Sequence, residues 1–182
     1  MASDKLRIAG TVHDSIVDGP GIRFTIFTQG CEHNCPGCHN PQTHPLNGGK
    51  EIAVDELIAE MLKNPLLDGV TLSGGEPFLQ ADKLCPVARA AKHSGLTVWT
   101  YSGWTFEQLW TGEASDDCRR ELLTLTDVLV DGPFILSERS LELKWCGSRN
   151  QRLIDVQNSI DRGEAVLYVP PVYGADFEIP KW

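Results

Sequence analysis

Apolar positions along the chain recur with two spacings, one typical of strands and one typical of helices. Short runs rich in β-branched and aromatic residues, bounded by Gly, Pro, Asn or Asp, predict strands. Such runs lie at residues 6–12, 22–28, 70–72, 96–101, 128–131, 153–156 and 165–169. Apolar residues three and four apart predict helices at 54–62 and 79–93, with shorter helices near 105–110 and 117–125. Asn64-Pro65 ends the first helix and Ser94-Gly95 ends the second.

The order of these elements favours an α/β fold. Strands that alternate with helices build parallel βαβ units rather than an all-α or all-β domain. A closed eight-stranded barrel of this kind has about 250 residues as a rule, whereas this chain has 182. We therefore expect one domain over residues 1–182, folded as an open, partial (β/α) barrel with a Pro-containing tail at 170–182. The active site of such a sheet lies at the C-terminal ends of its strands.

Three cysteines form a dense cluster of metal-binding side chains. Cys31, Cys35 and Cys38 have C-x3-C-x2-C spacing in one loop, directly after the strand predicted at 22–28. Gly and Pro turn the backbone between them, so the thiolates can converge on one metal centre. Three thiolates on a four-iron cluster leave one iron open to a substrate, which is the mark of chemistry rather than of a structural site. A Cys3His zinc site completed by His33 or His39 is the alternative.

Composition narrows the classes of function. The formal charge of −9 argues against nucleic-acid binding, which favours clustered Lys and Arg. No apolar run approaches the ~20 residues that span a bilayer, and the amino-terminal residues lack the apolar region of a signal peptide. Six cysteines in 182 residues is a low density for a disulfide scaffold. We expect a cytoplasmic protein without nucleic-acid or membrane partners, in which thiolates remain free to hold iron.

Taken together, the motifs resemble those of radical S-adenosylmethionine (SAM) enzymes. The cysteine loop matches the signature of that family. The strings Val17-Asp18-Gly19-Pro20-Gly21-Ile22-Arg23 and Cys38-His39-Asn40-Pro41 resemble its glycyl-radical-activating branch. Within that branch, residues 130–134 and 147–152 are similar to the activases of anaerobic ribonucleoside-triphosphate reductase. The resemblance covers about residues 8–157, and it implies an open partial barrel of the radical SAM type.

This resemblance implies one 4Fe-4S cluster held by Cys31, Cys35 and Cys38, with SAM bound to the fourth iron. Reductive cleavage of SAM then gives methionine and a 5′-deoxyadenosyl radical, which removes a hydrogen atom from a backbone glycine of a partner protein. The implied partners are a glycyl radical enzyme, here the large subunit of anaerobic ribonucleotide reductase, and a one-electron donor such as flavodoxin. Because the cofactors carry the chemistry, no general base or nucleophile is required.

The segment Ser73-Gly74-Gly75-Glu76-Pro77 resembles the methionine-binding motif of the family. Adjacent glycines let a ligand approach the backbone closely, and the exposed carbonyls and amides suit the amino-acid end of SAM. Glu76 can add a charge-assisted hydrogen bond to the ammonium group. An ordinary turn between a strand and a helix is the alternative.

Further ligand contacts are expected near the same rim. Gly37 and His39 flank the last cluster cysteine and can contact the adenine, while a loop-stabilising role for His39 is the alternative. Thr100 and Ser102 end a predicted strand and can line the ribose; related activases often carry Asp where Thr100 stands. Asp131, at another strand end, can hold a cation or a ligand hydroxyl, or cap a turn.

Other arginines and cysteines receive simpler assignments. Surface pairing is the expectation for Arg23, Arg149 and Arg152. Among the remaining cysteines, Cys85 is expected to be buried in a helix, Cys118 to be incidental, and Cys146 to be a candidate for redox sensitivity. A second cluster is not expected, because related activases that carry one have extra cysteines inserted directly after the first loop, and this chain has none there.

Three other functions stay open at this point. The protein can activate a different glycyl radical enzyme, or act on a small molecule as a radical SAM enzyme of the deazapurine synthase kind. The second option needs extra length for substrate binding, which 182 residues hardly provide. The third option is a zinc-binding interaction module without catalysis.

Overall fold

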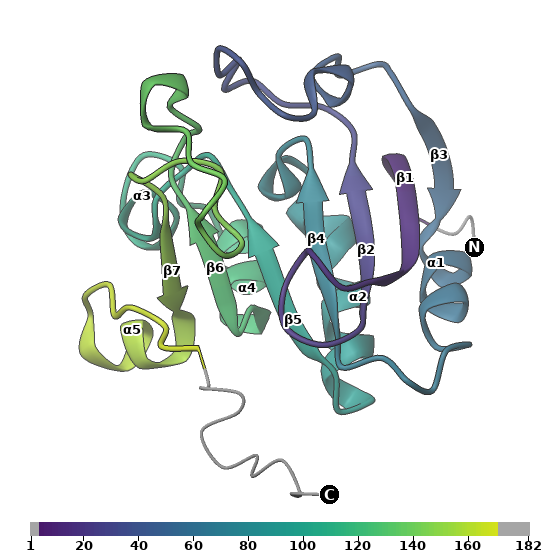
Figure 1. Cartoon of the computed structure of the whole chain (residues 1–182). Helices are drawn as coiled ribbons and strands as arrows, with labels where there is room; N and C mark the ends of the chain where they lie inside the picture. The colour runs from purple at the N-terminus through teal and green to yellow at the C-terminus, as the bar shows by residue number, and fades with distance from the viewer. Residues whose placement is uncertain (1–3, 171–182) are drawn as a thin grey trace, which may run out of the picture.

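The computed structural model describes residues 4–170 and contains a seven-stranded sheet in the order β3-β1-β2-β4-β5-β6-β7 (Figure 1). The strands are β1 (Lys5–Ser15), β2 (Arg23–Thr28), β3 (Lys50–Ala53), β4 (Gly69–Gly74), β5 (Thr97–Tyr101), β6 (Val128–Asp131) and β7 (Arg152–Asp155). The α-helices are α1 (Val54–Met61), α2 (Ala81–His93), α3 (Phe106–Trp110), α4 (Asp117–Leu125) and α5 (Val156–Arg162). Short 3-10 helices lie at η1 (Pro41–Thr43), η2 (Pro77–Gln80) and η3 (Leu136–Glu138).

The central strands of the sheet are parallel and its outer strands are antiparallel. β2, β4, β5 and β6 pair in parallel, and Thr28 at the end of β2 lies opposite Gly74 at the end of β4. β1 pairs antiparallel with both β2 and β3, while β7 returns antiparallel to β6. The sheet is therefore open, and the carboxyl ends of its parallel strands meet at one rim. The expected open α/β fold is confirmed.

Helices cover one face of the sheet and connecting segments cover the other. Figure 1 shows α2 and α4 behind the strands and α1 at the edge below β3, whereas the segment between β1 and β2 crosses in front of the strands. On the helical side, Leu72 and Val98 pack in the main hydrophobic core with Leu84 of α2. Trp99 and Val130 belong to a second apolar cluster, because successive side chains of a strand point to opposite faces. The sheet thus separates a helix-packed side from a loop-covered side.

Short polar side chains begin three of the helices. Thr105 and Gln108 form a capping box at α3, with Thr105 Oγ1 accepting from the Gln108 amide. Asp116 caps α4 and Asp155 caps α5 in the same way. Each such cap stabilises a helix by about 1 kcal/mol relative to alanine. No helix in the described part of the chain is long and apolar enough to cross a membrane.

Some local expectations differ from the structure. Residues 165–169 do not form a strand; Leu167 makes an isolated bridge with Ile154 instead. The helix expected at 79–93 begins with the 3-10 turn η2, and α2 itself starts at Ala81. β3 is not among the expected strands; it forms because residues 50–53 pair with residues 5–8 of β1, Lys50 opposite Ile8. Beyond Pro170, the tail expected at 170–182 lies outside the described residues.

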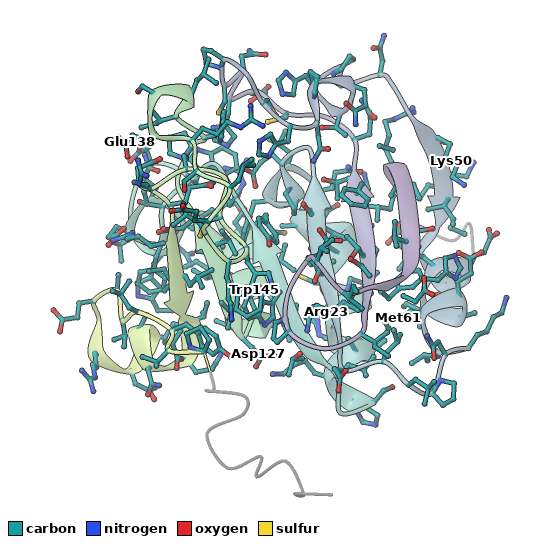
Figure 2. The ribbon with its side chains drawn as sticks, in the orientation of Figure 1. Arg23, Lys50, Met61, Asp127, Glu138 and Trp145 are labelled. Atoms are coloured by element: carbon teal, nitrogen blue, oxygen red, sulfur yellow. The ribbon has the colours of Figure 1, made fainter. Side chains whose placement is uncertain are left out.

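Arg23 is fully buried, which corrects the expectation that it pairs on the surface. Its guanidinium donates five hydrogen bonds, to Pro20 O, Val70 O, Thr71 Oγ1, Thr97 O and Thr97 Oγ1. The same group lies over the Trp99 ring, 5.6 Å from its centroid. Burial lowers the pKa of Arg23 to about 10, so the side chain is charged at neutral pH. Figure 2 shows Arg23 low on the sheet, because it begins β2 and so lies at the end opposite the rim.

Candidate functional site

A cavity of about 680 Å³ opens at the carboxyl ends of the parallel strands. Three segments far apart in sequence contribute to its wall. These are the cysteine loop after β2, the Ser73-Gly74-Gly75 segment that ends β4, and the Tyr101-Ser102-Gly103 segment that ends β5. Residues from the long connection between β6 and β7 complete the lining. The rim expected to carry the site is thus the place where the fold leaves space for a ligand.

The thiols of Cys31, Cys35 and Cys38 are free, half-buried and exposed to this one cavity. Backbone hydrogen bonds shape their loop: the Cys38 amide donates to Cys35 O at 3.1 Å. The Asn40 amide donates to Cys38 Sγ at 3.4 Å, a contact that stabilises negative charge on sulfur. Burial raises the pKa of Cys31 to about 11, which disfavours the thiolate unless a cation lies beside it. Three thiols on one cavity are the type of donor set that an iron–sulfur cluster takes.

The number of ligands separates a cluster from a zinc ion at this site. Among residues 4–170, no group of three or more His, Cys, Asp or Glu side chains is arranged to hold one metal ion. The three thiols line one cavity together with His33 and His39. Three thiolates suffice for a four-iron cluster whose fourth iron takes another ligand, whereas a structural zinc ion needs a fourth protein ligand.

The glycine pair at the end of β4 packs backbone against backbone with the end of β2 and with Gly30, which precedes the cysteine loop. Gly74 has φ +96°, and a Cβ added there would overlap the backbone of Phe27 and Thr28. A Cβ added to Gly75 would overlap the carbonyl group of Gly30. The amides of Gly75 and Glu76 donate to Thr28 O and Gly30 O, each at 2.8 Å. The missing side chains thus make room for the cysteine loop, while Ser73, Gly74 and Gly75 also line the cavity.

Glu76 lies beside the cavity without lining it. Its carboxylate is 1% exposed and accepts hydrogen bonds from the Phe78 amide, the Gly103 amide and Ser102 Oγ. His33 Nε2 lies 2.8 Å from Glu76 Oε2. Protein donors already occupy both carboxylate oxygens of Glu76. A ligand ammonium group would have to compete with these donors for the carboxylate.

Ser102 reaches the cavity, as expected, but Thr100 does not. Thr100 is fully buried on the helical side, where its Oγ1 lies 2.9 Å from Thr126 Oγ1. Strand alternation explains this correction, since residues on either side of Thr100 face the other way. Tyr101 lines the cavity instead, and burial raises the pKa of its hydroxyl.

Asp131 serves the scaffold rather than the cavity wall. Its carboxylate is 1% exposed and accepts from Arg152 Nε at 3.0 Å and Nη2 at 2.5 Å, and from the Phe106 amide at 2.8 Å. Arg152 also pairs with Glu107, so β6, β7 and α3 are joined at one point. These hydrogen bonds raise the pKa of Arg152 and lower the pKa of Glu107. Asp131 therefore pairs with Arg152 and accepts from the first residue of α3, rather than capping a turn of its own.

Gly37 and His39 both contact the connection between β6 and β7. Gly37 has φ +73°, and a Cβ added there would lie 2.8 Å from Leu136 Cδ1. The His39 ring lines the cavity and lies 5.0 Å from the Phe134 ring, centroid to centroid. A ligand contact and a loop-stabilising contact are therefore both available to His39.

The connection between β6 and β7 supplies lining residues that sequence patterns do not reveal. Phe134, Leu143, Trp145 and Cys146 all line the cavity. Hydrogen bonds close the base of this segment: Asn150 Nδ2 donates to Pro133 O at 2.8 Å and Gln151 Nε2 donates to Gly132 O at 3.0 Å. Burial raises the pKa of Cys146 to about 11. In the sequence, residues 130–134 and 147–152 at the two ends of this segment were the available signal, whereas residues 135–146 carried none.

Comparison with known proteins agrees with this geometry. Residues 17–154 match the family model described as a 4Fe-4S single cluster domain. The anaerobic ribonucleoside-triphosphate reductase-activating protein of Salmonella typhi is 35% identical over 144 residues, which cover 75% of this chain and 90% of that protein. The pyruvate formate-lyase-activating enzyme of Clostridium pasteurianum is 41% identical over 98 residues, covering 49% of this chain and 41% of that enzyme. QueE from Escherichia coli aligns over 70% of each chain with a TM-score of 0.46 and 14% identity.

The open α/β sheet with a thiol-lined cavity at its rim defines a 4Fe-4S protein of the radical SAM class. The chain belongs to the radical SAM family of glycyl-radical-activating enzymes, which are oxidoreductases. Within that family it is similar to anaerobic ribonucleoside-triphosphate reductase-activating proteins from several bacteria, including Escherichia coli strain K12 at 35% identity over 144 residues.

Proposed function

We propose that this protein cleaves SAM reductively at a 4Fe-4S cluster held by Cys31, Cys35 and Cys38, and so generates a glycyl radical on anaerobic ribonucleotide reductase. The observation that carries the proposal is that the three free thiols and the Ser73-Gly74-Gly75 segment line one cavity. When bound, the cluster and SAM supply the one-electron cleavage; the protein supplies binding, orientation and exclusion of side reactions.

The chain offers a distinct surface for each part of SAM. Ser73, Gly74 and Gly75, which line the cavity beside the cysteine loop, are proposed to face the amino-acid end of the ligand. Gly37 and His39 are proposed to contact the adenine, and Ser102 the ribose. These assignments agree with the lining of the cavity, which includes His39 and Ser102. Thr100 and Asp131 are proposed to support this wall from behind, through Thr126 and Arg152.

The partner protein is proposed to enter from the side lined by the connection between β6 and β7. Exposed apolar side chains lie on both sides of the opening, with Val17 72% exposed and Leu141 85% exposed. A glycine suits this entrance because its Cα carries no side chain that would block the approach of the reacting carbon. A net charge of −9 agrees with a protein partner better than with a nucleic acid. A one-electron donor such as flavodoxin and a reducing, cytoplasmic setting complete the proposal.

The test is an oxygen-free reaction of reconstituted, reduced protein with SAM and the reductase. We expect a glycyl doublet in the electron paramagnetic resonance (EPR) spectrum and one deoxyadenosine released per radical. A protein with Cys35→Ala, treated identically, is the control and should give neither product. Absence of both products with fully loaded wild-type protein would contradict the proposal.

A second candidate target follows from the similarity to a pyruvate formate-lyase-activating enzyme over 98 residues. The same reaction is therefore run with pyruvate formate-lyase in place of the reductase. If the doublet forms only on pyruvate formate-lyase, the proposed SAM cleavage stands and the proposed partner is wrong.

A further inference from the structure

We propose that His33 is a positioning residue, which holds the SAM-binding segment in register with the cluster loop by its contact with Glu76. The inference rests on the proposed function, because it names a residue that orients the two halves of that site. It assigns to Glu76 a role between protein segments in place of direct ligand binding.

His33 lies inside the cysteine loop, between Cys31 and Cys35, and its ring is held on several sides. Nε2 lies 2.8 Å from Glu76 Oε2, so the ring donates to the carboxylate through this nitrogen. The Trp104 ring stands edge-on to it with centroids 4.8 Å apart. The ring also occupies the space beside Gly103, where an added Cβ would overlap it. Because the His33 ring is held in place, its contact with Glu76 can fix the cysteine loop relative to the segment that carries Glu76.

Glu76 receives donors from three separate segments. Oε1 accepts from the Phe78 amide at 3.1 Å and from Ser102 Oγ at 3.0 Å. Oε2 accepts from His33 at 2.8 Å, the Gly103 amide at 2.9 Å and Ser102 Oγ at 3.0 Å. A carboxylate offers about four lone-pair sites. Protein donors therefore fill this carboxylate, which joins the cysteine loop, the end of β4 and the end of β5.

This junction sets the distance between cluster and ligand. The backbone contact of Gly30 with Gly75 and Glu76 fixes the two loops at one point. The His33–Glu76 contact fixes them at a second point, formed by side chains. Two points prevent one loop from rotating about the other. A misplacement of about 1 Å at a reacting centre can cost roughly 100-fold in rate, so a second point of attachment has a direct chemical purpose.

The experiment separates cluster loading from ligand binding. His33→Ala, His33→Gln and Glu76→Gln proteins are reconstituted beside wild type. The control is His93→Ala, a change to an exposed histidine at the end of α2. Iron and sulfide content, SAM affinity by equilibrium dialysis, and the EPR spectrum of the reduced cluster with and without SAM are measured. We expect wild-type iron in His33→Ala, SAM affinity about tenfold lower, and a smaller spectral change on adding SAM. His33→Gln, which keeps a donor, should recover part of the affinity.

A double variant tests whether the effect passes through Glu76. Because His33 acts through its contact with the Glu76 carboxylate, the losses in SAM affinity of His33→Ala and Glu76→Gln should not add in the His33→Ala/Glu76→Gln protein. Additive losses, or SAM affinity in His33→Ala equal to that of wild type, would overturn the inference. Loss of iron in both His33 variants would overturn it as well, by placing His33 in cluster binding. Failure of the wild-type protein to bind SAM would instead contradict the proposed function.

Discussion

Gly75 lies directly against Gly30, so closely that a single added methyl group at Gly75 would overlap the Gly30 carbonyl group. The contact joins the segment after β4 to the residue that precedes the first cysteine of the loop. It gives a sharper account of the glycine pair than ligand access alone, because the space is already filled by protein backbone.

Gly75→Ala is therefore expected to push the cysteine loop away from β4. Overpacking of this kind costs about 1–3 kcal/mol of unfolding free energy, since backbone must move. Denaturant unfolding measures that loss, and iron content after reconstitution should fall with it. Gly10→Ala is the matched control, because no atom lies within 4 Å of a Cβ added there. Wild-type stability and iron content in the Gly75 variant would refute this interpretation.

The six cysteines should divide into two groups. Alanine at Cys31, Cys35 or Cys38 is expected to abolish cluster binding, because each thiol faces the cavity and two remaining thiolates hold a cluster poorly. Alanine at Cys85, Cys118 or Cys146 should leave iron content near that of wild type. Iron and sulfide analysis after anaerobic reconstitution measures both outcomes. Full iron content in Cys35→Ala would contradict the assignment of Cys35 as a cluster ligand.

Arg23→Lys should destabilise the fold even though it preserves the charge. Five donors of the planar guanidinium meet five acceptors, whereas an ammonium group has three donors. The buried groups left unpaired cost about 1–3 kcal/mol, which urea unfolding can resolve. Arg149 is exposed, so Arg149→Lys should stay within about 0.5 kcal/mol of wild type. Equal stability of the two variants would contradict the role given to Arg23.

The ion pair of Glu107 with Arg152 should add a small acid-sensitive term to stability. Arg152 holds the pKa of Glu107 below its ordinary value, so the unfolded chain takes up a proton at a higher pH than the folded chain does. The stabilisation is present above the ordinary glutamate pKa and is lost as pH falls through the lowered one. Because the Glu107 side chain is 54% exposed, the ion pair stabilises the fold by at most about 1 kcal/mol.

Acidification should therefore lower the unfolding free energy of Glu107→Gln less than that of wild type. The difference should be at most about 1 kcal/mol. Unfolding curves at neutral and acidic pH measure the difference between variant and wild type. If the variant loses more unfolding free energy in acid than wild type does, the direction predicted for the Glu107 contribution is wrong.

Local patterns in the sequence predicted the rim of the sheet well. The alternation of strands and helices was enough to predict an open α/β fold, because periodicity and turn residues are local properties. The cysteine spacing and the glycine pair identified two segments of the cavity wall for the same reason. Ser102 and His39 also line the cavity.

The errors concern relationships between distant segments. Periodicity shows that Thr100 and Tyr101 face opposite ways, but not which face of the sheet carries the cavity. Arg23 appeared suited to the surface because its acceptors, such as Thr71 and Thr97, come from other strands. Glu76 meets His33 across 43 positions of sequence, a distance over which no periodic pattern extends. Side-chain pairing of this kind becomes visible only once the strands are placed side by side.

The closed base of the segment between β6 and β7 has a consequence for how such proteins diverge. Asn150 and Gln151 tie its two ends together at Pro133 and Gly132. A loop held at its base can double in length at a cost of only about 0.6 kcal/mol, so insertions there leave the sheet undisturbed. The length of the segment between Gly132 and Gln151 can therefore change without moving the strands that carry the cysteine loop.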